Sequence, residues 1–413
     1  MTPVTLLREV LRSVRMHALR FALTGLGIVW GVAMLVFLLA AADGFETNFG
    51  TQMDEIGQRA IFLFPGAITR ATVGQRGARP VELKRADLER LERLGGVAHA
   101  APHMPLGPRL VRAHGRAKLV AMYAVSAETP VIRNFRVRAG RLLTRADVDE
   151  HARVVLLGAK AARRIFGGDD AVGRTVHIDG IPFTVVGVTQ PKEEQVVYIG
   201  PADDEVAMIP ITTAQRRFIH DDVLAQVVVE PRTRDGSWAA TTDVRALLGF
   251  RHHFQGNDRG AMGHFNVEEV RQIVAPLFLG VRLFLTTASL VTLFVGAVGV
   301  MNIMLVVIGE RTKEIGLRKA LGGSPRAIFA QFLAETLTIC VLAGAAGALL
   351  GVTAVAGMAA AVGEGSVMNA PPVLLPSRVV VVLATLVLVG IGAGLLPALR
   401  AARVDPAVSL RGA

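Results

Sequence analysis

The stretch ERTKEIGLRKALGGSPR, residues 310–326, interrupts two of the most apolar parts of the chain. SLVTLFVGAVGVMNIMLVVIG (289–309) precedes it, and AIFAQFLAETLTICVLAGAAGALLGV (327–352) follows it. Each flank is long enough to cross about 30 Å of hydrocarbon as a helix that rises about 1.5 Å per residue. Seven charged side chains in seventeen residues are too costly to place in that hydrocarbon. The stretch therefore predicts a loop in water between two membrane-spanning helices.

The composition of the whole chain also favours a membrane protein. Of the 413 residues, 52% are hydrophobic and only 5% are aromatic, a balance that is uncommon in soluble proteins of this size. Four apolar runs are each near the ~20 residues that a spanning helix needs. They predict transmembrane helices at 21–42, 276–308, 328–362 and 378–399.

The distribution of basic side chains sets the predicted orientation. The formal net charge is +11, but residues 43–275 hold 31 Lys and Arg against 28 Asp and Glu, so most of the surplus flanks the apolar runs. Basic flanks lie on the cytoplasmic side of membrane helices, whereas a nucleic-acid-binding surface would gather them on the large domain. We therefore expect membrane lipid around the four spans and no nucleic-acid partner.

The predicted fold class is a membrane protein with four transmembrane helices and a large mixed α/β extracytoplasmic domain inserted between the first and second helices. Both termini lie in the cytoplasm under this orientation. The first span could instead be a cleaved secretory signal, but its apolar run of about 22 residues exceeds the ~7–15 of a signal core and favours a retained anchor. The predicted order is cytoplasmic N-terminus 1–20, helix 21–42, outer domain with stalk helices 43–275, helix 276–308, cytoplasmic loop 309–327, helix 328–362, short outer loop 363–377, helix 378–399 and cytoplasmic tail 400–413.

The outer segment shows both strand and helix patterns. Asp179-Gly180 divides two alternating runs within 175–189, which is a strong hairpin signal. Further strands are predicted at 152–158 and 224–231, and helices at 83–94, 159–167 and 237–250. The first span has no break until about Arg59, and 266–281 leads into the second span with only Pro276 as an interruption, so we expect helices that continue out of the bilayer.

The chemistry of common enzymes is absent from the sequence. No GxxxxGK[ST] phosphate loop, HExxH or GxSxG motif occurs. His252 and His253 lie in a polar, glycine-rich stretch that is typical of a solvated loop, and the acidic pair Asp203-Asp204 follows Pro201 as in a turn. We therefore predict no catalytic residue, no metal site and no cofactor bound by this chain.

The charged loop has the features of a short ordered helix. Glu314 and Arg318 form a favourable i, i+4 pair, as Glu310 and Lys313 do at i, i+3. Gly322-Gly323 would end this helix, after which Ser324 can cap the next helix with Pro325 at its first position. An apolar surface is predicted along one side of the loop helix, formed by Ile315, Leu317, Ala320 and Leu321. A basic linker that only sets the membrane orientation would need none of this order.

Small residues recur within the spans at a spacing that allows helices to approach closely. The predicted packing positions are Gly27, Gly31, Gly347, Gly351, Gly390 and Gly394. Glu335 is the one acid near hydrocarbon, and it either reaches the membrane interface or pairs with a basic group on a neighbouring helix. The single cysteine, Cys340, fits a small buried apolar residue, and the outer domain has no cysteine for a disulfide.

The loop ERTKEIGLRKALGG (310–323) resembles the signature of FtsX-like and MacB-like ABC transporter permeases. The resemblance continues through QFLAE (331–335) and the tail PALRAARVDP (397–406). The outer segment resembles the MacB-like periplasmic domain in RAGRLLTRAD (138–147), ARVVLLG (152–158), RIFGG (164–168), VGRTV (172–176) and FTVVGV (183–188). The similarity covers nearly the whole chain.

The resemblance implies a role for the charged loop: in that family it is the coupling helix that docks on an ATPase subunit. The contact residues it implies here are Glu310, Arg311, Glu314, Ile315, Gly316, Arg318, Lys319, Leu321 and Gly322. Because no phosphate loop is present, ATP and Mg²⁺ are expected on a separate ATPase chain. A second permease copy (the same chain or a close paralogue) and a periplasmic membrane-fusion protein are further expected partners.

The resemblance also implies a location and a task. It places the protein in the bacterial inner membrane, with the large domain in the periplasm. The implied work is mechanotransmission: ATP-driven motion acts on a peptide, a macrolide-like compound or a lipoprotein that is already outside. One alternative is an FtsX-type signalling scaffold that regulates a cell-wall hydrolase. Another is a stand-alone adhesion or receptor protein, for which the coupling loop would be superfluous.

Overall fold

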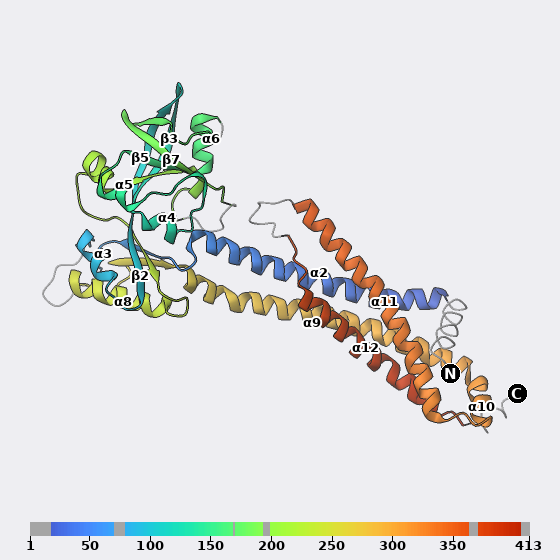
Figure 1. Cartoon of the computed structure of the whole chain (residues 1–413). Coiled ribbons are helices and arrows are strands. Elements are labelled where there is room, and N and C mark those ends of the chain that lie inside the picture. Colours follow the sequence, from blue (N-terminus) through green and yellow to red (C-terminus); the bar gives the residue numbers. More distant parts are fainter. Residues whose placement is uncertain (1–17, 70–78, 168–169, 193–198, 363–370, 406–413) are drawn as a thin grey trace. The chain divides into compact units, whose positions relative to one another are not determined.

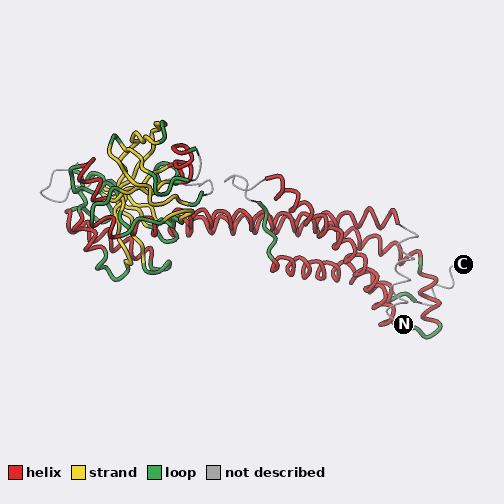
Figure 2. The backbone as a smooth tube through the Cα atoms, turned by 45° about the horizontal axis from the view of Figure 1, so that its top comes forward, coloured by secondary structure: helices red, strands yellow, loops and turns green. Residues whose placement is uncertain are grey.

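The computed structural model describes residues 18–69, 79–167, 170–192, 199–362 and 371–405. The chain forms two units, one made of residues 1–47 with 276–413 and the other of residues 48–275. Among the described residues, helices dominate the first unit and every strand lies in the second, as the red and yellow segments of Figure 2 show. Most of the predicted N-terminal segment 1–20, most of the outer loop 363–377 and most of the C-terminal tail lie outside the described residues.

The helical unit is built on long apolar helices (Figure 1). Within the described residues, four helices are long and apolar enough to cross a membrane. Their bounds and those of the short helix α10 are α2 Ala18–Gly57, α9 Val267–Glu310, α10 Thr312–Ala320, α11 Pro325–Val362 and α12 Pro376–Ala402. Thus α2 runs on well past residue 42, and α9 begins before residue 276 and includes Pro276.

Local sequence explains where the third and fourth helices begin. The Ser324 Oγ accepts a hydrogen bond from the Ala327 N–H at 3.3 Å, and Pro325 occupies the first position of α11, where no N–H is needed. Pro376 plays the same part at the start of α12. Both helices are therefore longer than the apolar runs that predicted them.

The other unit is a mixed ten-stranded sheet with short helices. The strand order is β10-β1-β9-β2-β3-β8-β5-β7-β4, with β6 paired to β2 and β7; the pairs β3–β8 and β5–β7 are parallel. The strands are β1 Ile61–Pro65, β2 Val97–Ala113, β3 Arg116–Val125, β4 Val137–Gly140, β5 Val154–Leu157, β6 Thr175–Ile178, β7 Ile181–Thr189, β8 Val206–Pro210, β9 Val227–Pro231 and β10 Met262–Asn266. The helices are α3 Arg85–Leu91, α4 Glu128–Ile132, α5 Arg145–Asp149, α6 Ala159–Phe166, α7 Ile211–Ala214 and α8 Ser237–His252, with single turns η1 Asp203–Glu205 and η2 Gln215–Ile219.

The predicted hairpin between β6 and β7 is confirmed. Ile178 pairs with Ile181, and both residues of the two-residue turn, Asp179 and Gly180, have positive φ angles of 47° and 87°. This is the backbone geometry that an Asp-Gly turn favours. The predicted strands at 152–158 and 224–231 and the helices at 83–94, 159–167 and 237–250 are also found, as β5, β9, α3, α6 and α8.

The predicted turn at Asp203-Asp204 is found as the single turn η1, although both side chains are buried. The stretch 251–264 is a solvated loop only in part, because α8 extends to His252 and β10 begins at Met262. Within it Asp258 is buried and accepts hydrogen bonds from the Thr69 N–H (2.9 Å) and hydroxyl (2.6 Å). His252 at the end of α8 contacts the buried Asp87 at 3.1 Å. In each case a partner distant in sequence accounts for the burial.

Candidate coupling site at the charged loop

The charged loop folds into the nine-residue helix α10, shorter than the predicted 310–321. Arg311 lies between α9 and α10 with φ −96° and ψ 9°, which separates the two helices. At the other end, Gly322 adopts φ +94°, a left-handed conformation that side chains with a Cβ rarely take. The Gly323 N–H then donates to the Arg318 carbonyl at 2.9 Å. The chain thus turns sharply on each side of α10.

The predicted apolar surface of this helix is divided between two faces. Ile315 is only 3% exposed and packs in the apolar core of the helical unit, which also contains Ile328 and Phe332. Leu317 and Leu321 are 52% and 80% exposed. The expectation of one continuous exposed stripe that includes Ile315 is therefore wrong. Gly316 is buried as well, so the inward face holds Ile315 and Gly316.

Three basic residues of the loop bind groups on α11 and α12. Arg311 lies 3.5 Å from the carboxylate of Glu335, which is buried, so the alternative of a paired Glu335 fits the structure. Arg318 donates to the Gln331 side chain at 2.9 Å and to Glu314 at 2.8 Å. These contacts hold α10 against the first part of α11.

The third basic residue, Lys319, binds the end of α12. Its Nζ donates to the carbonyl oxygens of Ala402 (2.6 Å) and Val404 (2.8 Å). Carbonyl groups at a helix C-terminus lack intrahelical partners and carry partial negative charge, so an ammonium group satisfies both needs. The basic residues of the loop thus join α10 to both α11 and α12.

The face of α10 that is left exposed combines apolar and charged groups. Lys313, Glu314, Leu317, Ala320 and Leu321 are exposed, as are Glu310 before the helix and Gly322 after it. Two leucines with charges around them have the composition of a docking surface for another protein. Of the predicted contact residues, the structure thus leaves Glu310, Glu314, Leu321 and Gly322 exposed, with Arg311, Arg318 and Lys319 partly covered by intramolecular partners.

The six predicted packing glycines lie where helices of this unit meet. A Cβ built on Gly27 would lie 3.0 Å from the Gly296 Cα, and one on Gly31 3.0 Å from the Leu293 Cα. On Gly347 and Gly351 a Cβ would lie 2.4 Å from the Val29 carbonyl oxygen and 2.9 Å from that of Ala33. A Cβ built on Gly390 of α12 would lie 3.3 Å from the Cys340 Cβ, and one on Gly394 would lie 3.0 Å from the Thr336 Cβ; both neighbours belong to α11. Gly296, which the sequence reading did not single out, completes the contact with Gly27.

A second ionic cluster joins α2, α9 and α12 at the start of α12. Asp43 is buried and receives two hydrogen bonds from Arg378, at 2.8 Å and 2.9 Å. Arg282 lies 3.2 Å from the same carboxylate. Since Lys319 donates to carbonyl oxygens at the other end of α12, charged side chains contact this helix at both ends.

The sheet unit contains a buried ionic network that the sequence reading missed. Arg133 donates to Asp203 at 2.7 Å, and Lys192 donates to the same carboxylate at 2.8 Å and to the Glu55 carbonyl near the end of α2. Burial, followed by the charge of Arg133, lowers the pKa of His103 to about 3, so this histidine is neutral beside Arg133. Burial likewise lowers the pKa of Lys192. No local motif marks this set, because its members come from five separate segments.

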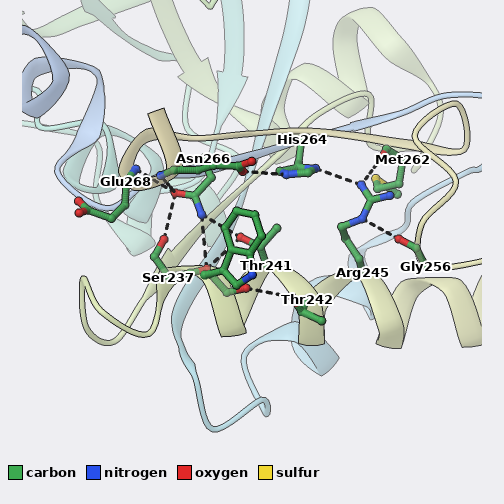
Figure 3. A network of polar contacts seen from close by, with 11 residues as sticks. Ser237, Thr241, Thr242, Arg245, Gly256, Met262, His264, Asn266 and Glu268 are labelled. Carbon is green, nitrogen blue, oxygen red and sulfur yellow. Dashed lines mark hydrogen bonds and ion pairs between the residues drawn. The ribbon is translucent and has the colours of Figure 1, made fainter. Parts of the chain in front are cut away.

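A polar network at the start of α9 is shown in Figure 3. Asn266 caps the helix: its Oδ1 accepts from the N–H groups of Glu268 (2.9 Å) and Glu269 (3.3 Å) and from the Ser237 hydroxyl at 3.0 Å. Nearby, Arg245 donates to the Gly256 carbonyl at 2.8 Å and also contacts Met262 and His264. These bonds fix the first turn of α9 to α8 and β10.

Within the described ranges, no group of three or more His, Cys, Asp and Glu side chains could hold a metal ion.

Comparison with known proteins agrees with this architecture. Residues 21–247 match the family model described as MacB-like periplasmic core domain, and residues 286–406 match that described as FtsX-like permease C-terminal. The Macrolide export ATP-binding/permease protein MacB of Azoarcus sp. (strain BH72) is 32% identical over 98% of this chain and 58% of its own length. The protein of the same name from Rhodospirillum rubrum is 32% identical over 97% of this chain and 59% of its own length. The chain thus spans about three-fifths of the length of the curated relatives it matches.

A solved structure, the periplasmic region of MacB from Actinobacillus actinomycetemcomitans, matches 54% of this chain and 95% of its own length, with 19% identity and a TM-score of 0.44. The helices and the mixed α/β domain define a multi-pass membrane protein with a periplasmic core domain between its first two spans. The chain belongs to the MacB-like and FtsX-like family of ABC transporter permeases.

Proposed function

We propose that this chain is a permease subunit that works by mechanotransmission. In this mechanism an ATPase subunit binds the exposed face of α10 and moves it when ATP is hydrolysed. The motion reaches α11 and α12 through the contacts of Arg311, Arg318 and Lys319. The observation that carries the proposal is the arrangement around α10. Three basic residues of the loop contact α11 and the end of α12, and two leucines of the loop are exposed.

The outer domain is the part that acts on the substrate in this proposal. The substrate is an amphiphilic compound (a peptide, a macrolide-like molecule or a lipoprotein) taken from outside the membrane. The relatives named for macrolide export support this choice of substrate class. The working assembly comprises two permease copies, ATPase subunits that hold ATP and Mg²⁺, and a periplasmic membrane-fusion protein. It lies in the bacterial inner membrane with both termini in the cytoplasm.

Co-purification of the ATPase subunit tests the proposed contact. Leu317→Asp with Leu321→Asp should abolish it, because each exposed apolar anchor is worth about 2 kcal/mol, or about thirtyfold in affinity. The matched control is Leu317→Met with Leu321→Met, which keeps both side chains apolar and should retain the partner. Undiminished binding by the aspartate variant would overturn the assignment of α10.

Ile315 gives a second arm of the same test. Because Ile315 is buried, Ile315→Asp should lower the yield and thermal stability of the permease itself, whereas the Leu317 and Leu321 variants should leave both unchanged. The purified 413-residue chain alone should hydrolyse no ATP, since it has no phosphate loop.

A further inference from the structure

A groove lies within the sheet unit, apart from α10. Its volume is ≈ 340 Å³, which is near the lower end of the about 300–1,000 Å³ common for small-molecule sites. Its lining comes from α3, α4, α5 and α7 and from part of β2. A ligand in the groove would therefore contact several elements of the domain at once.

Part of the groove's lining is apolar and part is charged. Six side chains contribute carbon atoms to it: Leu88, Ala100, Pro102, Val148, Ile211 and Leu224. Most of them are buried parts of the domain core, so this surface is built on rigid elements. It suits a ligand with an apolar body.

The rim of the groove carries an excess of negative charge. Four carboxylates line it (Glu89, Glu92, Glu128 and Asp149) against two guanidinium groups, Arg85 and Arg145. Arg145 is already paired with Glu128 at 2.7 Å. Among the described residues, the side chains of Glu89 in α3 and Asp149 in α5 make no hydrogen bond or ion pair.

The electrostatic environment of Arg145 agrees with that excess. The hydrogen bond to Glu128 raises the pKa of Arg145, and the charges of Glu92 and Asp149 add to the rise. The field at the rim therefore favours a cation. A metal ion does not fit, since no three ligating side chains converge among the described residues.

We propose that this groove binds an organic cation that has an apolar body. Glu89 and Asp149 attract the charged group, and the apolar side chains among the lining residues contact the rest of the molecule. This proposal rests on the proposed function, because the groove would be the place where the outer domain holds an amphiphile. The groove and the proposed ATPase contact on α10 share no residue, so the experiments can reject one of the two sites and leave the other.

Two probe ions of the same shape and opposite charge test the site. The full-length chain, reconstituted in nanodiscs of zwitterionic lipid, is equilibrated with tetraphenylphosphonium or with tetraphenylborate, and uptake by empty nanodiscs is subtracted. The cation should bind in saturable fashion and more weakly as salt is raised, because exposed charges are screened within about 10 Å at 0.1 M. The anion should show no saturable binding.

Variants of the two free carboxylates provide the decisive comparison. Glu89→Gln with Asp149→Asn should weaken cation binding about fivefold or more. The matched control is Glu82→Gln with Glu150→Gln, which removes two exposed carboxylates that do not line the groove and should bind as the wild type does. Ala127→Phe, which fills the groove, should also reduce binding.

Equal binding of both ions, no saturable binding of the cation, or equal loss in the control would overturn the proposal. ATPase co-purification is measured on the same variants and should be unchanged. Absence of the expected cation binding together with intact ATPase co-purification would therefore count against the groove alone.

Discussion

At the scale of single residues, Lys319 is the group whose role is most sharply defined. Its ammonium group binds two carbonyl oxygens at the end of α12, while Lys313, on the same short helix, is exposed. The sequence shows two lysines six positions apart in one basic loop. Only the fold shows that Lys319 binds another helix of the same chain, because its partners lie more than eighty residues away in the sequence.

Lys319→Met should uncouple ATP hydrolysis from transport without releasing the ATPase subunit. The change removes two charge-assisted hydrogen bonds between α10 and the end of α12, each worth about 1.5–3 kcal/mol, and leaves Leu317 and Leu321 in place. The measurement compares ATPase co-purification with substrate-stimulated ATP turnover. Lys313→Met is the control and should keep stimulation. A Lys319→Met protein with normal stimulation would contradict this role.

His103 should make the outer domain less stable in acid. Its pKa is about 3 in the folded protein and about 6.5 in an unfolded chain, so the unfolded chain binds more protons between these values. Its contribution is complete above about pH 6.5 and falls by roughly 1.4 kcal/mol per pH unit as the pH decreases toward 3. His103→Gln should show a smaller drop in unfolding temperature between pH 7 and pH 5 than the wild type. Identical drops would argue against a neutral buried histidine.

At the scale of elements, the sequence predicts what local pattern determines. Asp179-Gly180 favours the turn in which it is found, and Ser324 with Pro325 determines where α11 begins. The long strand β2 could not be predicted, because Pro102, Pro105 and Pro108 interrupt its pattern and its register shifts between Pro105 and Gly107. Similarly, the burial of Ile315 depends on α11, so the helix pattern of 310–321 alone could not assign its face.

The glycine contacts lead to a prediction with a control on the same helix. Gly347→Ala places a methyl group 2.4 Å from the Val29 carbonyl oxygen of α2, so the two helices must separate, at a cost of about 1–3 kcal/mol. Gly357→Ala meets nothing within 4 Å and should be neutral or slightly stabilising, since alanine favours helix. Thermal unfolding of the two detergent-solubilised variants gives the comparison. Equal unfolding temperatures would show that α2 and α11 do not pack closely at Gly347.

At the scale of the whole molecule, the four helices and the charge distribution predict on which side of the membrane each part lies. Ala86 is exposed in the sheet unit, and Ala320 is exposed on α10. With Cys340 replaced by alanine, single cysteines at these positions should react oppositely with a membrane-impermeant thiol reagent. In intact spheroplasts Ala86→Cys should be labelled and Ala320→Cys should not; after permeabilisation both should be. Because basic flanks set orientation through loops such as 310–326, the opposite result would reverse the topology and remove α10 from the side where ATP is found. Labelling of both positions in intact spheroplasts would instead show that α9 does not cross the membrane.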